Sequence, residues 1–214
     1  MTRILIADDH AIVRCGLKQL LSGESDFLVA GEAANGLEAL KQLHEQPFDV
    51  LLMDMSMPGR SGIELIKQVK SEHPKLAILV LSMHKEEQYA VRAMKAGAQG
   101  YLTKESAPEL LISAIRKVAL GGIYISSGAA ERMALELYSN HDATPHTLLS
   151  DREFQVFSMI VVGTPINGIA DKLSLSVKTV STHKTRILQK MRMTNAAELI
   201  HYAIRHQLLE SPGD

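Results

Sequence analysis

The sequence contains very little cysteine and no long apolar run. Its single cysteine, Cys15, excludes an internal disulfide, is consistent with a reducing compartment and is expected to be buried filler. The longest apolar run, 76–81, is far too short to span a bilayer. The start of the chain is too short and too acidic for a signal peptide. These features predict a cytoplasmic protein with no membrane partner.

Internal repeats and low-complexity segments are also missing, and the net charge is close to zero. The chain has 214 residues, 46% apolar and 22% charged, which favours folded protein over disorder and allows two small domains. Residues 1–146 carry 15 basic and 18 acidic side chains, whereas residues 147–214 carry 8 and 6. This small asymmetry hints at two units with different partners.

The first 121 residues alternate between short apolar runs and helical spacing. Each apolar run is followed by a stretch whose apolar residues recur at helical spacing. The alternation predicts an α/β unit, with a doubly wound, five-stranded parallel sheet covered by helices on both faces. The five expected strands are 4–7, 28–30, 50–53, 76–81 and 101–103.

Polar side chains follow four of these strands, at the points where the strands end: Asp8, Asp9, Asp54, Ser82 and Lys104. Three carboxylates at one sheet edge must share protons or bind a cation. With oxygen ligands and no nearby histidine or cysteine, the set favours Mg²⁺ or Mn²⁺ over zinc. A carboxylate nucleophile, a hard cation, a lysine and a hydroxyl are the parts needed to form an aspartyl-phosphate.

Each of these residues, taken alone, also has a purely structural interpretation. Asp54 and Ser82 could cap the turns or helices that follow them. Lys104 could be an ordinary solvated lysine, and Tyr101, in the last strand, could be half-buried packing. The functional interpretation rests on finding the whole set at equivalent strand ends.

The pattern changes after Gly121. Residues 126–138 favour a helix with a weak apolar face, 139–147 are polar and rich in turn formers, and 148–209 have helical spacing throughout. We therefore expect a first domain at 1–121, a linker containing a helix at 122–147, a small all-α domain at 148–209 and a tail at 210–214.

The second domain begins with a capping-box pattern, Ser150 and Glu153, and contains a short helix, a tight turn and a helix capped by Ser176. No acid occurs between this cap and Glu198, although a solvated helix normally mixes both charges. Such a helix-turn-helix pattern predicts DNA as partner. The outward face of the third helix comprises Lys178, Ser181, Thr182, Lys184, Thr185 and Arg186.

The first unit resembles the receiver domain of two-component response regulators. The resemblance rests on Asp8-Asp9, on Asp54 within 53–59, on Ser82 and on Tyr101 to Lys104. It implies a flavodoxin-like sheet with Asp54 as phosphoacceptor. It also implies that Asp9, Asp54 and the main-chain carbonyl of Ser56 hold Mg²⁺, with Asp8 acting through a bound water.

The same resemblance assigns the remaining residues at this edge to the phosphoryl group. Lys104 would pair with it, Ser82 would donate a hydrogen bond to it, and Tyr101 would swing inward on activation. The phosphoryl donor would be a histidine of a sensor kinase.

The second unit resembles the LuxR-type DNA-binding domain, in 150–153, 169–170 and 177–183. The last helix, 196–207, would be the dimerising one, although its apolar residues Leu199, Tyr202 and Ala203 could equally belong to the core. Two departures stand out: 165–168 differ from the usual pattern and include Gly168, which favours a looser helix, and Gln207 replaces the usual glycine.

Together the two resemblances indicate a NarL/FixJ-type response regulator that dimerises on phosphorylation and binds double-stranded DNA. Lys178, Lys184 and Arg186 would then contact phosphates, and Ser181, Thr182 and Thr185 base edges. One alternative is a regulator that works without phosphorylation. Another is a phosphatase or phosphotransferase, but such enzymes of the dehalogenase type need an acid two residues after the nucleophile, where this chain has Ser56. We therefore expect no enzyme.

Overall fold

The computed structural model describes residues 1–57, 62–83, 87–138, 144–206 and 208; the side chains of 87, 88, 132 and 135–138 are not described. The chain divides into two compact units, Met1–Met133 and Ala134–Asp214. The division falls inside α6 (Ser127–Tyr138), the helix expected in the linker. The predicted boundaries at 121 and 148 stay a prediction, and the tail at 210–214, Gln207 and the turn residues 58–59 lie outside the described residues.

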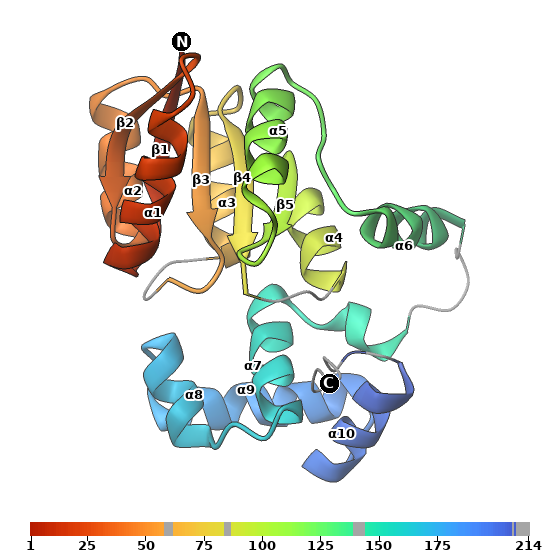
Figure 1. Cartoon of the computed structure of the whole chain (residues 1–214). Helices are drawn as coiled ribbons and strands as arrows, with labels where there is room; N and C mark the ends of the chain where they lie inside the picture. The colour runs from red at the N-terminus through yellow and green to blue at the C-terminus, as the bar shows by residue number, and fades with distance from the viewer. Residues whose placement is uncertain (58–61, 84–86, 139–143, 207, 209–214) are drawn as a thin grey trace. The chain divides into compact units, whose positions relative to one another are not determined.

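The first unit contains one five-stranded parallel sheet in the order β2-β1-β3-β4-β5 (Figure 1). This confirms the predicted flavodoxin-like arrangement. Four strands are longer than the expected runs because residues flanking the runs also pair, and β4 is shifted by one residue at the same length. The five strands are β1 (Thr2–Ala7), β2 (Phe27–Ala33), β3 (Val50–Asp54), β4 (Ala77–Ser82) and β5 (Gly100–Thr103).

The helices between the strands cover both faces of the sheet: in Figure 1, α1 and α5 lie over one face, and α2 and α3 over the other. On the first face, Leu21 and Ile115 pack on inward-facing strand residues such as Ile4, Val50 and Leu79. The helices are α1 (Ala11–Ser22), α2 (Gly36–Glu45), α3 (Gly62–Glu72), α4 (Glu87–Lys95) and α5 (Pro108–Ala119).

The packing of α1 on the core determines the exposure of Cys15. Cys15 is exposed on α1, so the expectation that it is buried filler was wrong. Leu17 and Leu20 of the same helix pack partly on the core, which leaves Cys15 on the solvent side.

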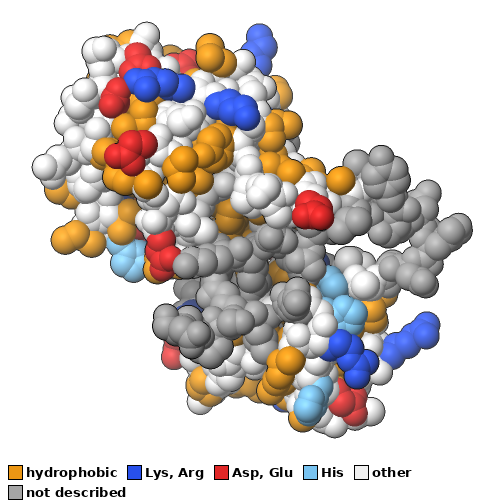
Figure 2. All heavy atoms as spheres, turned by 45° about the vertical axis from the view of Figure 1, so that its right-hand side comes forward, with side chains coloured by type: hydrophobic (Ala, Val, Ile, Leu, Met, Phe, Trp, Pro, Cys, Tyr) orange, Lys and Arg blue, Asp and Glu red, His pale blue; other side chains and the backbone are white. Residues whose placement is uncertain are grey.

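On the face of the chain drawn in Figure 2, acidic and basic side chains are interspersed among apolar ones, as expected of a nearly neutral chain.

The second unit is helical throughout its described part. It contains η1 (Pro145–Leu148), α7 (Asp151–Val161), α8 (Ile166–Leu173), α9 (Val177–Met191) and α10 (Ala196–Arg205). The predicted capping box is confirmed: Glu153 donates its amide to the Ser150 hydroxyl, and its carboxylate accepts from the Ser150 amide at 2.8 Å. The α8 helix forms from Ile166 despite Gly168, and turns into α9 through Ser174 at φ 52°.

The core of the second unit includes two of the three apolar residues of α10 whose role was left open. Leu199 and Ala203 are fully buried, together with Val180 and Ile187 of α9. The Tyr202 hydroxyl lies 2.7 Å from His146 Nδ1 within the same unit. Leu199 and Ala203 therefore belong to the intramolecular core, Tyr202 is half-buried against the same unit, and a dimerising role of α10 stays a prediction. None of the described helices in either unit combines the length and apolar character needed to cross a bilayer.

Candidate phosphoacceptor site and nucleic-acid interface

The topology brings the predicted acids together at the carboxyl edge of the sheet. The two central strands, β1 and β3, lie side by side with Ala7 paired to Met53. Asp8 follows the first strand and Asp54 ends the second. Between β1 and β3 the strand order reverses, and such a switch point is where open α/β sheets bind ligands.

Lys104 joins the two acids. Its Nζ lies 2.6 Å from Asp8 Oδ2 and 2.9 Å from Asp54 Oδ2. Both carboxylates are buried, and the lysine side chain is only 11% exposed. The Lys104 amide donates to the Ser82 carbonyl at 2.8 Å, which continues the β4–β5 pairing and fixes the lysine at the edge. The three predicted residues thus form one buried ion-pair cluster.

The burial and charges of this cluster act on its ionisation. Burial raises the pKa of the Asp54 carboxyl above its ordinary value, although Lys104 and the Ser56 amide partly oppose that effect. Burial alone would lower the pKa of Lys104, but its contacts with Asp8 and Asp54 outweigh the burial and raise it. The lysine therefore stays charged, and additional positive charge at this edge would stabilise the ionised form of Asp54.

A histidine also belongs to this edge, which the sequence analysis did not expect. His10 Nδ1 lies 2.9 Å from Asp9 Oδ1 and 3.3 Å from Asp8 Oδ1, and its amide donates to Asp8 Oδ1 at 2.8 Å. One ligand atom from each of Asp8, Asp9, His10 and Asp54 lies within 4.8 Å of the others. The expectation of a site with no nearby histidine was therefore wrong: the turn after β1 folds the ring back over the acids.

The donor set still fits a hard divalent cation. Three carboxylates converge, two of them buried, and such oxygens are the ligands that Mg²⁺ prefers. Ser56 lies beside them, with its amide donating to Asp54 Oδ1 at 3.2 Å. His10 adds one exposed imidazole, a ligand that also binds softer metal ions.

The two remaining predicted residues lie on the neighbouring strands. Ser82 is fully buried at the end of β4, one residue beyond the position paired with Asp54. Tyr101 is buried deeper in the sheet, inside β5, where it pairs with Val80. Thr103 pairs with Ser82 in the strand register, and its hydroxyl lies 3.0 Å from the Ser106 hydroxyl. The sequence analysis did not single out Thr103.

The candidate nucleic-acid interface is the outer face of α9. Its N-terminus is capped by Ser176, which accepts from the Thr179 amide at 3.0 Å, and its first turn contains no acid. The positive end of the helix dipole is therefore left unopposed by an acid of that turn. Of the six predicted contact residues, Lys178, Thr182, Thr185 and Arg186 are exposed, and Ser181 and Lys184 are half-buried.

Two contacts separate this face from the rest of the helix. Thr182 and Thr185 donate their hydroxyls to main-chain carbonyls one turn earlier, at 2.9 and 3.1 Å, so each is left with acceptor lone pairs facing outward. Lys190, by contrast, lies 2.6 Å from the buried Glu153 carboxylate. Its charge is therefore engaged by Glu153, although the side chain is 41% exposed, and Lys190 does not extend the basic face.

Two protein-family models match the chain. The model described as "Response regulator receiver domain" matches residues 4–116, and that of "Bacterial regulatory proteins, luxR family" matches residues 147–203. The chain belongs to the response-regulator family. Its two matched segments make it a NarL/FixJ-type transcriptional regulator, with a receiver domain and a LuxR-type DNA-binding domain.

Similar proteins span the whole length of this response regulator. The response regulator UvrY of Escherichia coli K12 is 39% identical over 209 residues, covering 97% of this chain and 96% of UvrY. The oxygen regulatory protein NreC of Staphylococcus carnosus is 39% identical over 97% of this chain and 99% of NreC. RcsB of Salmonella enterica serovar Typhimurium, solved bound to the promoter rprA in the presence of phosphomimetic BeF3−, has a TM-score of 0.65 at 29% identity, covering 94% of this chain and 98% of RcsB.

Proposed function

We propose that this response regulator is switched by transfer of a phosphoryl group from a sensor histidine kinase to Asp54. The observation that carries the proposal is the position of Lys104 Nζ, 2.9 Å from the Asp54 carboxylate and 2.6 Å from that of Asp8, in a buried cluster at the carboxyl edge of the sheet. A carboxylate beside a fixed cation at the end of a strand is suited to carry one phosphoryl group.

In the proposed step, a carboxylate oxygen of Asp54 attacks the phosphorus of a phosphohistidine. An O–P bond forms as the N–P bond breaks, and the departing imidazole takes up a proton. Lys104 offsets the charge that gathers on the phosphoryl oxygens. Mg²⁺ (or Mn²⁺), held by Asp9, Asp54 and the Ser56 carbonyl, with Asp8 acting through a water, would supply further positive charge there.

The remaining residues of the edge would read the phosphorylated state. Ser82, fully buried at the end of β4, would donate its hydroxyl to the phosphoryl group. Tyr101, buried inside β5, would turn inward as that strand end shifts. We infer that Asp54 is phosphorylated once per signal and that the chain does not turn over a phosphate substrate repeatedly. The reason is that Ser56 stands where a phosphatase of the dehalogenase type needs its acid–base carboxylate.

The output would be DNA binding by a homodimer through α9. The exposed Lys178 and Arg186, with the half-buried Lys184, would contact phosphates, and Ser181, Thr182 and Thr185 would reach base edges in the major groove. RcsB, which was solved bound to promoter DNA, is similar to 94% of this chain and supports this output. A two-fold dimer would read two half-sites about one helical turn apart.

Incubation with an acyl phosphate and Mg²⁺ tests the phosphoacceptor. We expect one acid-labile phosphoryl group per chain, detected by intact-protein mass spectrometry, and none on the Asp54→Asn variant. Asp49→Asn is the matched control, since Asp49 precedes the same strand at its other end and accepts from the Arg3 amide. Equal labelling of Asp54→Asn and the unchanged chain would rule out Asp54.

Size-exclusion chromatography of the same samples tests the dimer. The labelled chain should elute as a dimer, and the Asp54→Asn variant should elute unchanged by the phosphodonor. A labelled chain that remains monomeric, even with operator DNA present, would contradict the proposed output.

A further inference from the structure

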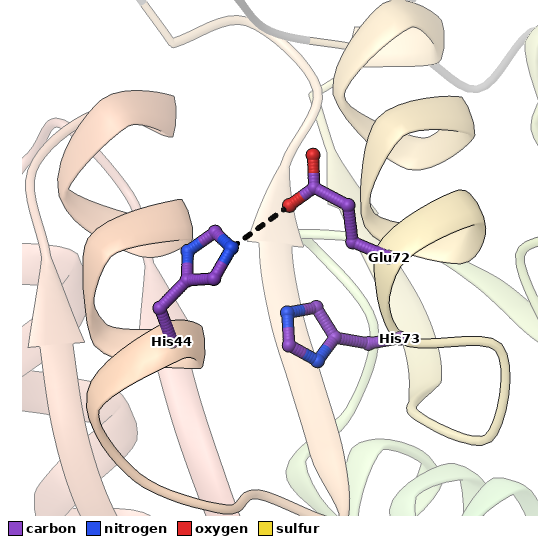
Figure 3. Close-up of side chains that lie close together, drawn as sticks. All are labelled: His44, Glu72 and His73. Carbon is purple, nitrogen blue, oxygen red and sulfur yellow. Dashed lines mark ion pairs between the residues drawn. The ribbon is translucent and has the colours of Figure 1, made fainter.

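A second group of potential metal ligands lies at the opposite edge of the sheet from Asp54. Figure 3 shows the side chains of His44, Glu72 and His73 pointing toward one another. His44 is in the last turn of α2, Glu72 ends α3, and His73 follows it, close to where β3 and β4 begin. One ligand atom from each residue lies within 4.8 Å of the others.

The hydrogen bonding of His44 leaves one ring nitrogen available. Its Nδ1 lies 2.8 Å from the Leu40 carbonyl, which can only accept, so Nδ1 carries a hydrogen. In the neutral ring, the Nε2 lone pair then faces Glu72 Oε2 at 3.2 Å. Two lone pairs at that distance repel, so either a proton or a metal cation must lie between them.

The other two residues are also oriented for a ligand. Glu72 Oε1 accepts from the Gln68 side chain at 2.9 Å, which fixes the carboxylate and leaves Oε2 turned toward His44. His73 Nε2 is buried and has no hydrogen-bond partner among the described residues. Partners such as the Leu40 carbonyl and Gln68 are the outer contacts that orient metal ligands in known sites.

The distances suit a tetrahedral ion. With metal–nitrogen and metal–oxygen bonds of about 2.1 Å, two ligand atoms of a zinc site are about 3.4 Å apart. The His44–Glu72 separation of 3.2 Å is close to this, and the third ligand would move by no more than about 1.4 Å. The side chains of His44 and Glu72 are 61% and 33% exposed, so the fourth position would be open to water.

We propose that His44, Glu72 and His73 bind a divalent transition-metal ion, with Zn²⁺ as the reference, which links the C-terminal ends of α2 and α3. Two imidazoles and one carboxylate are a ligand set that zinc accepts and Mg²⁺ does not favour. The site is independent of the proposed phosphorylation, because it lies at the other edge of the sheet. The competing account is a protonated His44 paired with Glu72 at the negative end of α2.

The test is a Zn²⁺ titration of the full chain against a chromophoric chelator, with Mg²⁺ in excess to occupy the acidic edge. We expect one Zn²⁺ per chain. His44→Ala and His73→Ala should each weaken binding by at least about tenfold, because each removes one of three ligands. Glu72→Gln keeps the shape and should also weaken it. Co²⁺ should give the intense visible bands of a tetrahedral site in the unchanged chain and not in these three variants.

Two control variants test the assignment, and circular dichroism checks that each variant is folded. His201→Ala, an exposed histidine on α10, should leave the titration unchanged. His10→Ala should also leave it unchanged; a Zn²⁺ ion lost in that variant but retained in His44→Ala would overturn the assignment. Absence of Zn²⁺ binding to the unchanged chain, or equal binding by a folded His44→Ala/His73→Ala double variant, would favour the proton-bridged pair and refute the proposal.

Discussion

Removal of Lys104 should destabilise the receiver unit strongly, because it leaves two buried carboxylates side by side. Lys104→Met keeps most of the side-chain volume and removes only the charge, which now lies 2.6 and 2.9 Å from the two acids. At an effective dielectric constant of 20, each contact is worth roughly 6 kcal/mol before desolvation. Losing one partner of a buried pair costs about 3–5 kcal/mol in practice. We expect about 3 kcal/mol at neutral pH, the lower end, since one acid can take up a proton.

The pH dependence of this loss gives a second, independent check. Burial already raises the pKa of Asp54, and removal of Lys104 should raise it further. Between the unfolded and the folded pKa, the native variant then binds more protons than its unfolded state, so its stability falls as pH rises, by up to about 1.4 kcal/mol per pH unit. The difference from the unchanged chain should therefore be largest above the folded pKa and shrink toward about pH 4.

Amide hydrogen exchange of peptides from β3 and β4 measures the opening free energy of this unit alone. Lys41→Met, an exposed lysine on α2, is the matched control and should change little. Added Mg²⁺ should stabilise Lys104→Met more than the unchanged chain, and Asp54→Asn should reduce the cost of Lys104→Met because one buried acid is gone. A loss below about 1 kcal/mol that does not vary with pH would show that the ion pair is not what stabilises this edge.

Two further predictions concern the second unit. Ser150→Ala removes the hydroxyl that accepts from the Glu153 amide and should lower the free energy of unfolding by about 1 kcal/mol. In a domain this small, that loss lowers the calorimetric midpoint by about 4–8 °C. Ser113→Ala, on the exposed side of α5, is the control and should leave the midpoint unchanged. Lys178→Ala should weaken binding to every DNA sequence alike and lower the slope of log K against log salt by about 1, with Lys117→Ala as control; a loss confined to one operator would exclude a phosphate contact.

The sheet and its acidic edge could be predicted because both depend on local pattern. The apolar run of β3 ends at Asp54, and in a parallel sheet all such ends meet at one edge. The strand order could not be obtained in this way, since it depends on which strands pair across long sequence separations. The contact of Lys104 with both acids follows from that pairing, because the Ser82 carbonyl positions the lysine.

Residues brought together only by packing escaped the sequence analysis. His44 and His73 are 29 positions apart, and each simply ends or follows a helix, so nothing local indicates that their rings meet. His10 is a different case: it directly follows Asp8 and Asp9 in the sequence, and the tight turn after β1, where its amide donates to Asp8, brings its ring to the acids. On α10, Leu199 and Tyr202 have the spacing of either a core or an interface; the structure places Leu199 in the core and leaves Tyr202 half-buried beside His146.

If Asp54 is the phosphoacceptor, the response to phosphorylation should begin at β5. Lys104 now divides its charge between Asp8 and Asp54, and a phosphoryl group on Asp54 would compete for it with more negative charge than either acid. A shift of the lysine larger than its side chain can absorb would act on its main chain, which is hydrogen-bonded to Ser82 at the end of β4. Among the described strands β5 has β4 as its one neighbour, and its outer side is held only by a short bridge to Tyr124, so we expect it to resist displacement less than an inner strand. Tyr101 lies on that strand, so under this proposal it would report the change before the buried core of β1 or β3 does.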